Sequence, residues 1–274
     1  MTALASSQGE GAISSYTIAF ALLTIPVGVI GVPLGVVIFP SISREHALGA
    51  TAAYVGMVTR SVRLLIFVMV PIAALGIALR SPVVELLFGY GKFDAASIER
   101  TAATFALFLL GLPAHASIAI LARAFYARQD TRTPVAAAVL AVAVNTALGI
   151  TFVGPLGLPG LALAIASAAW IEAGVLLVAL GRRVPTFELP AIGRVLAESA
   201  VGAAAAAFVA ALTASALGLL LEPGAPKASI LAGTTMATLA GGATYVAVAI
   251  ALRIPELPSI VGLVTDQIRR RRGS

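Results

Sequence analysis

The chain has 274 residues, of which 59% are hydrophobic and 11% are charged, whereas soluble globular domains carry roughly 25% charged residues. This composition, with a mean hydropathy of +1.02, excludes an ordinary soluble domain and indicates a membrane protein. The net charge of +6 does not point to nucleic acid, because the basic residues cluster between apolar segments; we expect no nucleic-acid partner. The chain has no cysteine, which excludes disulfides and thiolate metal sites.

Seven apolar segments follow one another along the chain, each long enough to cross about 30 Å of hydrocarbon as a helix. Helices are the expected element, because the lipid interior offers no water to backbone N–H and C=O groups. We therefore predict an all-α polytopic transmembrane bundle of about seven spans. The predicted spans are 13–40, 57–80, 98–125, 134–153, 159–181, 193–220 and 228–252.

The first three spans contain four prolines, Pro26, Pro33, Pro71 and Pro113. Each proline frees a carbonyl and tends to kink its helix, so neighbouring groups or water must satisfy that carbonyl. Two explanations stay open, namely simple adjustment of packing and the rocking bundle of a transporter.

Two connections also have predicted structures. The stretch "GPLGLPG" at 154–160 is a tight turn, so the fourth and fifth spans are expected to form an antiparallel hairpin. The stretch "PVVELLFGYGKF" at 82–93 mixes apolar and aromatic residues with two charges, which indicates a short external element at headgroup level.

Basic residues are distributed unequally between the two sides of the predicted bundle. The side reached after the first, third, fifth and seventh spans holds far more of them, and acidic residues dilute those on the other side. The rule that basic loops stay inside predicts a cytoplasmic-membrane protein with its N-terminus outside and its C-terminus in the cytoplasm. The richer side carries Arg44, Arg60, Arg63, Arg123, Arg128, Arg132, Arg182, Arg183, Arg194, Arg253 and Arg269 to Arg272.

An odd number of spans with the N-terminus outside is awkward for a complete protein, because the first residues lack the basic region of a signal peptide. We expect that a preceding helix has been lost.

The stretch "FYARQDTRTPV" at 125–135 concentrates charge between two apolar spans, and its candidate loop or gate residues are Arg128, Gln129, Asp130 and Arg132. In one interpretation the arginines anchor a cytoplasmic loop and Asp130 helps to cap the following helix. In the other, the loop is part of a cytoplasmic gate whose charges pair with an opposite lobe.

Polar groups within the spans are the candidate cavity residues, because burying a charge in the membrane costs several kcal/mol unless it is paired or faces water. Glu172 lies about halfway along the fifth span and could contact a cation, relay a proton or sit neutral in a polar pocket. His115 and Asn145 are weaker candidates, since such residues often serve as hydrogen-bonding core residues. Arg63 could bind a phosphate or extend to the lipid headgroups.

The C-terminal sequence predicts an amphipathic helix anchored on the inner leaflet, where anionic lipid would attract its four consecutive arginines. Its apolar residues at helical spacing are Leu257, Ile260, Val261, Val264 and Ile268. The chain has no nucleophile elbow, phosphate loop, H-E-x-x-H motif or carboxylate dyad, so we expect no enzyme activity, no cofactor and no metal site.

Four stretches together resemble the MurJ/MviN family of lipid II flippases, within the larger group of multidrug, oligosaccharidyl-lipid and polysaccharide exporters. The stretches are "FYARQDTRTPV", "LLFGYGKFD", "IPVGVIGVPLGVVIFPSISRE" and "GPLGLPGLALAIASAAWIEA". Family members have fourteen helices in two six-helix lobes plus two extra C-terminal helices, and this chain resembles helices eight to fourteen.

The resemblance implies movement of a polyprenyl-pyrophosphate-linked peptidoglycan precursor, lipid II, from the inner to the outer leaflet by alternating access of a cationic cavity. It implies a C-lobe-like bundle of five helices at 1–185, two additional helices at 186–253 that line a groove for the lipid tail, and a basic cytoplasmic tail at 254–274. It also implies a partner N-terminal lobe that this sequence does not contain.

One position departs from the family pattern. Ala21 stands where the family has a cavity arginine, and a pyrophosphate needs guanidinium donors to replace its hydration shell. Two alternatives therefore remain, an exporter of another polyprenyl-linked glycan and a non-transporting membrane scaffold or remnant that binds lipid or cell-wall enzymes.

Overall fold

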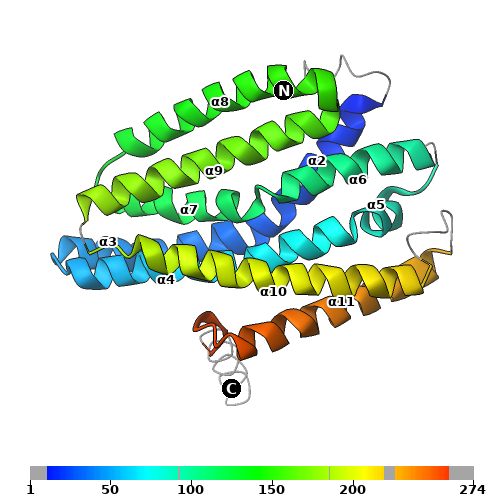
Figure 1. Ribbon diagram of the computed structural model, residues 1–274. Coiled ribbons are helices and arrows are strands. Elements are labelled where there is room, and N and C mark those ends of the chain that lie inside the picture. The colour runs from blue at the N-terminus through cyan, green and yellow to red at the C-terminus, as the bar shows by residue number, and fades with distance from the viewer. Residues whose placement is uncertain (1–10, 92, 185, 219–225, 259–274) are drawn as a thin grey trace, which may run out of the picture.

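The structure is a computed structural model that describes residues 11–91, 93–184, 186–218 and 226–258, and every element in those ranges is helical (Figure 1). The elements in chain order are α2 (Ala12–Pro26), the π-helical η1 (Val27–Gly31), α3 (Val32–Ala47), α4 (Thr51–Ala78), α5 (Arg80–Phe88), α6 (Ala95–Leu109), α7 (Leu112–Ala127), α8 (Arg132–Leu156), α9 (Leu158–Arg183), α10 (Leu189–Ala216) and α11 (Lys227–Ala251).

Within the described ranges, six helical units are long and apolar enough to cross a membrane, and the bent pair α6 and α7 makes a seventh. The prediction of an all-α bundle with about seven spans is confirmed. The first span is continuous from Ala12 to Ala47 and contains the π-helical turn η1 between Pro26 and Pro33. The predicted amphipathic tail lies outside the described residues from 259 onward, and Leu257 is the one described member of its five predicted periodic apolar residues.

Helix α4 lies at the centre and packs against α3, α6, α7, α10 and α11. Its fully buried residues recur every three or four positions, which is the spacing of one helical face. Those residues are Tyr54, Val58, Val62, Leu65 and Met69.

Pro71 does not break α4, but it leaves one backbone carbonyl of α4 without its usual donor, and a residue of α11 supplies the donor instead. Proline cannot donate the backbone hydrogen bond to the residue four positions earlier, which here is Phe67. The hydroxyl of Tyr245 on α11 donates to the Phe67 carbonyl at 2.7 Å. A side chain of α11 therefore satisfies the carbonyl that Pro71 leaves open.

The third span is broken where Pro113 predicted a kink. Helices α6 and α7 meet at an angle of 43° around Leu110 and Gly111. The indole N–H of Trp170 on α9 donates to the Leu110 carbonyl at 2.8 Å, so a neighbouring helix supplies the donor at the break. A Cβ on Gly111 would lie 2.8 Å from the Ala166 backbone, so α7 and α9 approach closely there only because residue 111 is glycine.

Helices α8 and α9 form the predicted hairpin and lie side by side (Figure 1). The single residue between them, Gly157, has φ 62 and ψ −140, a conformation that favours glycine. Helix α8 is the least buried of the six long helical units, with 17% of its most apolar 18 residues buried against 44% for α9. In a bilayer its exposed valines, such as Val135 and Val142, would face lipid.

Helices α10 and α11 pack against each other, and α10 also lies along α4. A Cβ on Gly241 would lie 2.8 Å from the Ala206 carbonyl oxygen, so small residues permit the close approach of this pair. The α3–α4, α7–α8 and α9–α10 connections lie at one end of the bundle, and the α5–α6 connection lies at the other (Figure 1). The arginine-rich connections of the sequence thus share one end.

Candidate functional site

The loop between α7 and α8 begins with a Schellman motif, the arrangement that closes a helix C-terminus with a left-handed residue. Gln129 has φ 56, its N–H donates to the Tyr126 carbonyl at 2.9 Å, and the Asp130 N–H donates to the Phe125 carbonyl at 3.0 Å. Glycine is the usual residue at such a position. The backbone of Gln129 therefore serves to end α7.

Asp130 is held by α8 and α9 together. Its carboxylate accepts from the Thr133 backbone N–H at 3.1 Å and from the Thr133 hydroxyl at 2.7 Å, and it pairs with Arg183 at the end of α9. Arg183 also donates to the Thr133 hydroxyl at 2.8 Å. The hydrogen bonds from Thr133, followed by those from Arg183, lower the pKa of Asp130. This arrangement caps the start of α8 and ties it to α9.

Arg128 and Arg132 occupy different environments. The Arg128 guanidinium lies 5.9 Å from the ring centroid of Tyr54, whose hydroxyl donates to the Ala124 carbonyl at 2.9 Å near the end of α7. Arg132 is exposed at the start of α8. The predicted pairing of these charges with an opposite lobe stays a prediction.

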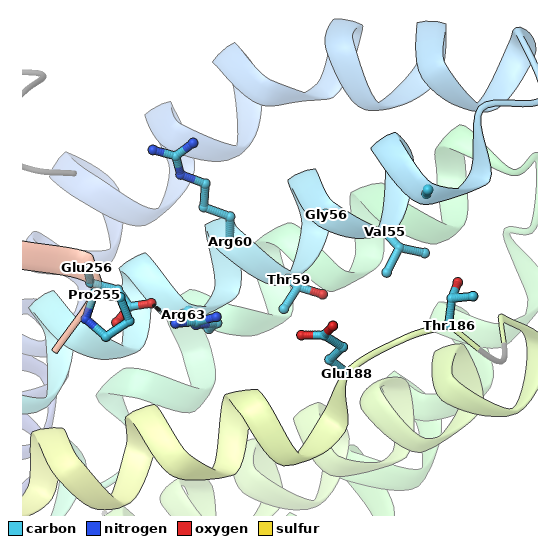
Figure 2. A pocket seen from close by; sticks show the side chains of 10 residues that line it. Val55, Gly56, Thr59, Arg60, Arg63, Thr186, Glu188, Pro255 and Glu256 are labelled. Atoms are coloured by element: carbon cyan, nitrogen blue, oxygen red, sulfur yellow. Dashed lines mark ion pairs between the residues drawn. The ribbon is translucent and has the colours of Figure 1, made fainter. Parts of the chain in front are cut away.

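Arg63 of α4 is paired across the fold with Glu256, which follows α11. Arg63 Nη2 lies 2.6 Å from Glu256 Oε1, and the two side chains are 23% and 7% exposed. Both residues line a cavity of about 470 Å³ together with Thr59, Arg60 and Glu188 (Figure 2). Of the four predicted cavity residues, Arg63 is the one that lines this cavity.

The other three candidates lie on three separate helices. His115 is on α7, Asn145 on α8 and Glu172 on α9, and all three are half-buried. His115 Nε2 and Asn145 Oδ1 are buried without a hydrogen-bond partner. Among the described residues, no hydrogen bond or ion pair brings them together, and no group of three His, Asp or Glu side chains could hold a metal ion.

Arg183 and Glu256, the ion-pair partners of Asp130 and Arg63, were not predicted from the sequence to be site residues. Arg183 was counted only as a marker of orientation, and Glu256 was included in the C-terminal tail without a role of its own. Their sequence signal was weak, because each acts through a residue that is distant along the chain, Asp130 or Arg63.

The chain matches known proteins over most of its length. The model of the family "Lipid II flippase MurJ" matches residues 1–226. The chain belongs to the lipid II flippase MurJ family.

Relatives in this family come from several bacteria. A "Probable lipid II flippase MurJ" of Rhizobium meliloti is 35% identical over 205 residues, which cover 73% of this chain and 38% of the relative. A second "Probable lipid II flippase MurJ", from Rhizobium tropici, is 36% identical over 66% of this chain and 34% of the relative. The "Lipid II flippase MurJ" of Burkholderia cenocepacia is 33% identical over 66% of this chain and 35% of the relative. The chain therefore matches little more than a third of the length of these relatives.

A solved structure shares the fold. The structure titled "Lipid II flippase MurJ, inward closed conformation" matches with a TM-score of 0.73 and 22% sequence identity, over 91% of this chain and 49% of that one. The helical arrangement in Figure 1 is thus the arrangement of about half of a MurJ-family protein.

Proposed function

We propose that this chain forms the second lobe of a lipid II flippase and moves the peptidoglycan precursor across the cytoplasmic membrane together with an N-terminal lobe, in the same polypeptide or another. The observation that carries the proposal is the match of the MurJ family model to residues 1–226. The shared helical fold supports it. The function is transport, without chemical conversion of the lipid.

We further propose that 1–185 forms the lobe proper, that 186–253 supplies the two additional helices, and that 254–274 is a cytoplasmic tail that contacts anionic inner-leaflet lipid. An apolar cavity of about 280 Å³ lies between α10 and the α6–α7 break, lined by residues such as Leu110, Trp170 and Ala203. Its apolar walls are suited to a lipid tail. Arg63, His115, Asn145 and Glu172 remain candidate contacts for the headgroup, and 128–132 remains a candidate gate.

Complementation tests the flippase proposal. Cells depleted of their own flippase would receive this chain alone, an N-terminal lobe of the Burkholderia cenocepacia relative alone, or both together. We expect growth only with both, since a pyrophosphate needs cationic groups that Ala21 does not supply. Failure of the pair, with both chains stably inserted, would contradict the proposal.

A non-transporting lipid-binding scaffold is the second candidate, favoured by Ala21, which is exposed on α2. Ala21→Arg separates the two functions. In a transporter this change is expected to improve growth of the complemented cells, whereas in a scaffold it would leave growth unchanged. Ala143→Arg, at an exposed position on α8, is the control for a general effect of added charge.

The proposed orientation has its own test, because the chain contains no cysteine. Single cysteines at Gln129 and at Gly91 would be labelled in intact cells with a thiol reagent that does not cross the membrane. We expect labelling at 91 and protection at 129. The reverse pattern would overturn the cytoplasmic placement of the 128–131 loop.

A further inference from the structure

The cavity next to Arg63 lies where the first half of α4 faces two other segments. One segment joins α9 to α10 and contributes Glu188, and the other follows α11 and contributes Glu256 (Figure 2). Arg63 of α4 is paired with Glu256 at this cavity, whereas the Arg60 guanidinium points away from it, to the other side of α4 (Figure 2). Its volume of about 470 Å³ falls within the range of small-molecule sites, which is roughly 300–1,000 Å³.

The cavity lies at the depth of lipid headgroups. Helix α4 has 28 residues, more than the span of a hydrocarbon layer requires. About 20 residues at a rise of 1.5 Å cover roughly 30 Å, so counting back from Ala78 puts the edge of the hydrocarbon near Thr59. The charged groups of the cavity are therefore at the boundary between hydrocarbon and headgroups.

The polar groups around the cavity are incompletely satisfied by the protein. Arg63 and Glu256 meet through one nitrogen and one oxygen, while Arg63 Nε, Glu256 Oε2 and the Thr59 hydroxyl are buried without partners. Buried polar groups are normally hydrogen-bonded, and a guanidinium can engage two oxygens at once. A small shift of these side chains would let a ligand with both donors and acceptors complete them.

Glu188 adds an acceptor on the opposite wall. Its residue is exposed, and in Figure 2 its carboxylate points across the cavity toward Thr59. Among the residues that the structure describes, no ion pair involves this carboxylate. In Figure 2 Arg63 lies between Glu188 and Glu256, so a cation in the cavity would pair with Glu188.

We propose that this cavity binds the headgroup of a phospholipid that carries a phosphate and a primary ammonium. The phosphate lies against Arg63 and Thr59, and the ammonium pairs with Glu188. A zwitterion supplies a partner for both Arg63 and Glu188, whereas an anionic headgroup without an amine would leave the Glu188 carboxylate beside negative charge. A trimethylated ammonium has no N–H to donate to this carboxylate.

Lipid retention measured by native mass spectrometry tests this proposal. The delipidated chain, 1–274, would be mixed in detergent with phosphatidylethanolamine, phosphatidylcholine or phosphatidylglycerol of identical acyl chains. We expect phosphatidylethanolamine to bind about tenfold more tightly than either of the others, the effect of one or two charge-assisted hydrogen bonds. Equal binding of the first two lipids, or tighter binding of phosphatidylglycerol, would overturn the proposal.

Glu188→Gln tests the assigned site. Since Glu188 is exposed, the variant should fold, and we expect its affinity for phosphatidylethanolamine to fall to that for phosphatidylcholine. Glu99→Gln, at an exposed position on α6 at the other end of the bundle, is the matched control and should keep the preference. An unchanged preference in Glu188→Gln would show that the headgroup binds elsewhere.

Water-soluble phosphoethanolamine distinguishes a lipid from a free ligand of the same chemistry. We expect it to displace the lipid only in large excess, because it lacks the acyl chains that the neighbouring hydrocarbon holds. Displacement at equal concentration would overturn the assignment to a membrane lipid. These measurements require no transport, so they stand apart from the outcome of the complementation experiment.

Discussion

The ion pairs Asp130–Arg183 and Arg63–Glu256 lie in contrasting surroundings. Asp130 and Arg183 are at the exposed end of the bundle, and Thr133 bonds to both of them. Arg63 and Glu256 are more deeply buried, yet each has a polar atom without a partner. The difference teaches that burial and completeness of bonding are separate properties, and that an incompletely bonded buried pair marks a place where a ligand can add bonds.

Breaking the Arg63–Glu256 pair should give the largest effect on stability. Glu256→Ala leaves the Arg63 charge without its partner, and we expect the free energy of unfolding to fall by about 2–3 kcal/mol, slightly below the usual range for buried pairs because Arg63 is partly exposed. SDS titration in mixed micelles, followed by the fluorescence of Trp170, measures the change. The double variant Arg63→Met, Glu256→Leu should recover most of the loss, and a double variant as unstable as the single one would contradict this account.

Removing the Tyr245 hydroxyl from α11 measures how much its buried hydrogen bond to the Phe67 carbonyl contributes to stability. Tyr245→Phe leaves the Phe67 carbonyl open opposite Pro71, and we expect a loss of about 1–2 kcal/mol in the same titration. Tyr126→Phe, at an exposed tyrosine on α7, is the control and should change little. Equal stability of Tyr245→Phe and the original chain would mean that the Phe67 carbonyl needs no partner.

Disrupting the Asp130–Arg183 pair should have a smaller effect on stability. Asp130→Ala removes the cap of α8 and the partner of Arg183, for which we expect a loss of about 1 kcal/mol at neutral pH. Because the folded state lowers the pKa of Asp130, its contribution is present above the ordinary value of 3.8 and is lost as the pH falls below it. Asp130→Asn should weaken this pH dependence, and an identical pH profile would exclude Asp130 as its source.

The smallest expected change is a gain. Gln129→Gly relieves the left-handed conformation of residue 129, and we expect stability to rise by about 0.5–1 kcal/mol. Gln129→Val should lower stability, since a β-branched residue is strained there. If the glycine variant also supports growth in the complementation experiment, the side chain of Gln129 is dispensable for a gate; loss of growth would assign it a role beyond ending α7.

The spans were predictable from sequence because the length of an apolar segment is a local property. The predicted 134–153 and 159–181 fall inside α8 and α9, and Gly157 provides the turn between them. The predicted span 193–220 began too late, because α10 starts at Leu189. Pro190 lies in the first turn of α10, where the N–H that proline lacks would have no partner within the helix. The break between α6 and α7 was foreshadowed by Pro113, although its exact place at Leu110 and Gly111 was not.

The candidate site was less predictable than the spans. Arg63 was singled out from its position near the end of a span, but Glu256 and Glu188 approach it from segments far along the chain. Likewise, the charges of the 128–132 loop suggested a gate or an anchor, and the contact that holds Asp130 comes from Arg183 at the end of another helix. Periodicity and composition carry no information about such pairings.

The sequence by itself determined the number of spans, the clustering of arginines at one end and the carbonyls that prolines would leave open, because these follow from hydrocarbon thickness and backbone chemistry. Only the tertiary structure decided which groups meet those needs: Trp170 at the α6–α7 break, Tyr245 opposite Pro71, and Glu256 beside Arg63. The reason is that contacts between helices depend on how their surfaces pack, and packing brings together residues whose separation along the chain gives no sign of their contact.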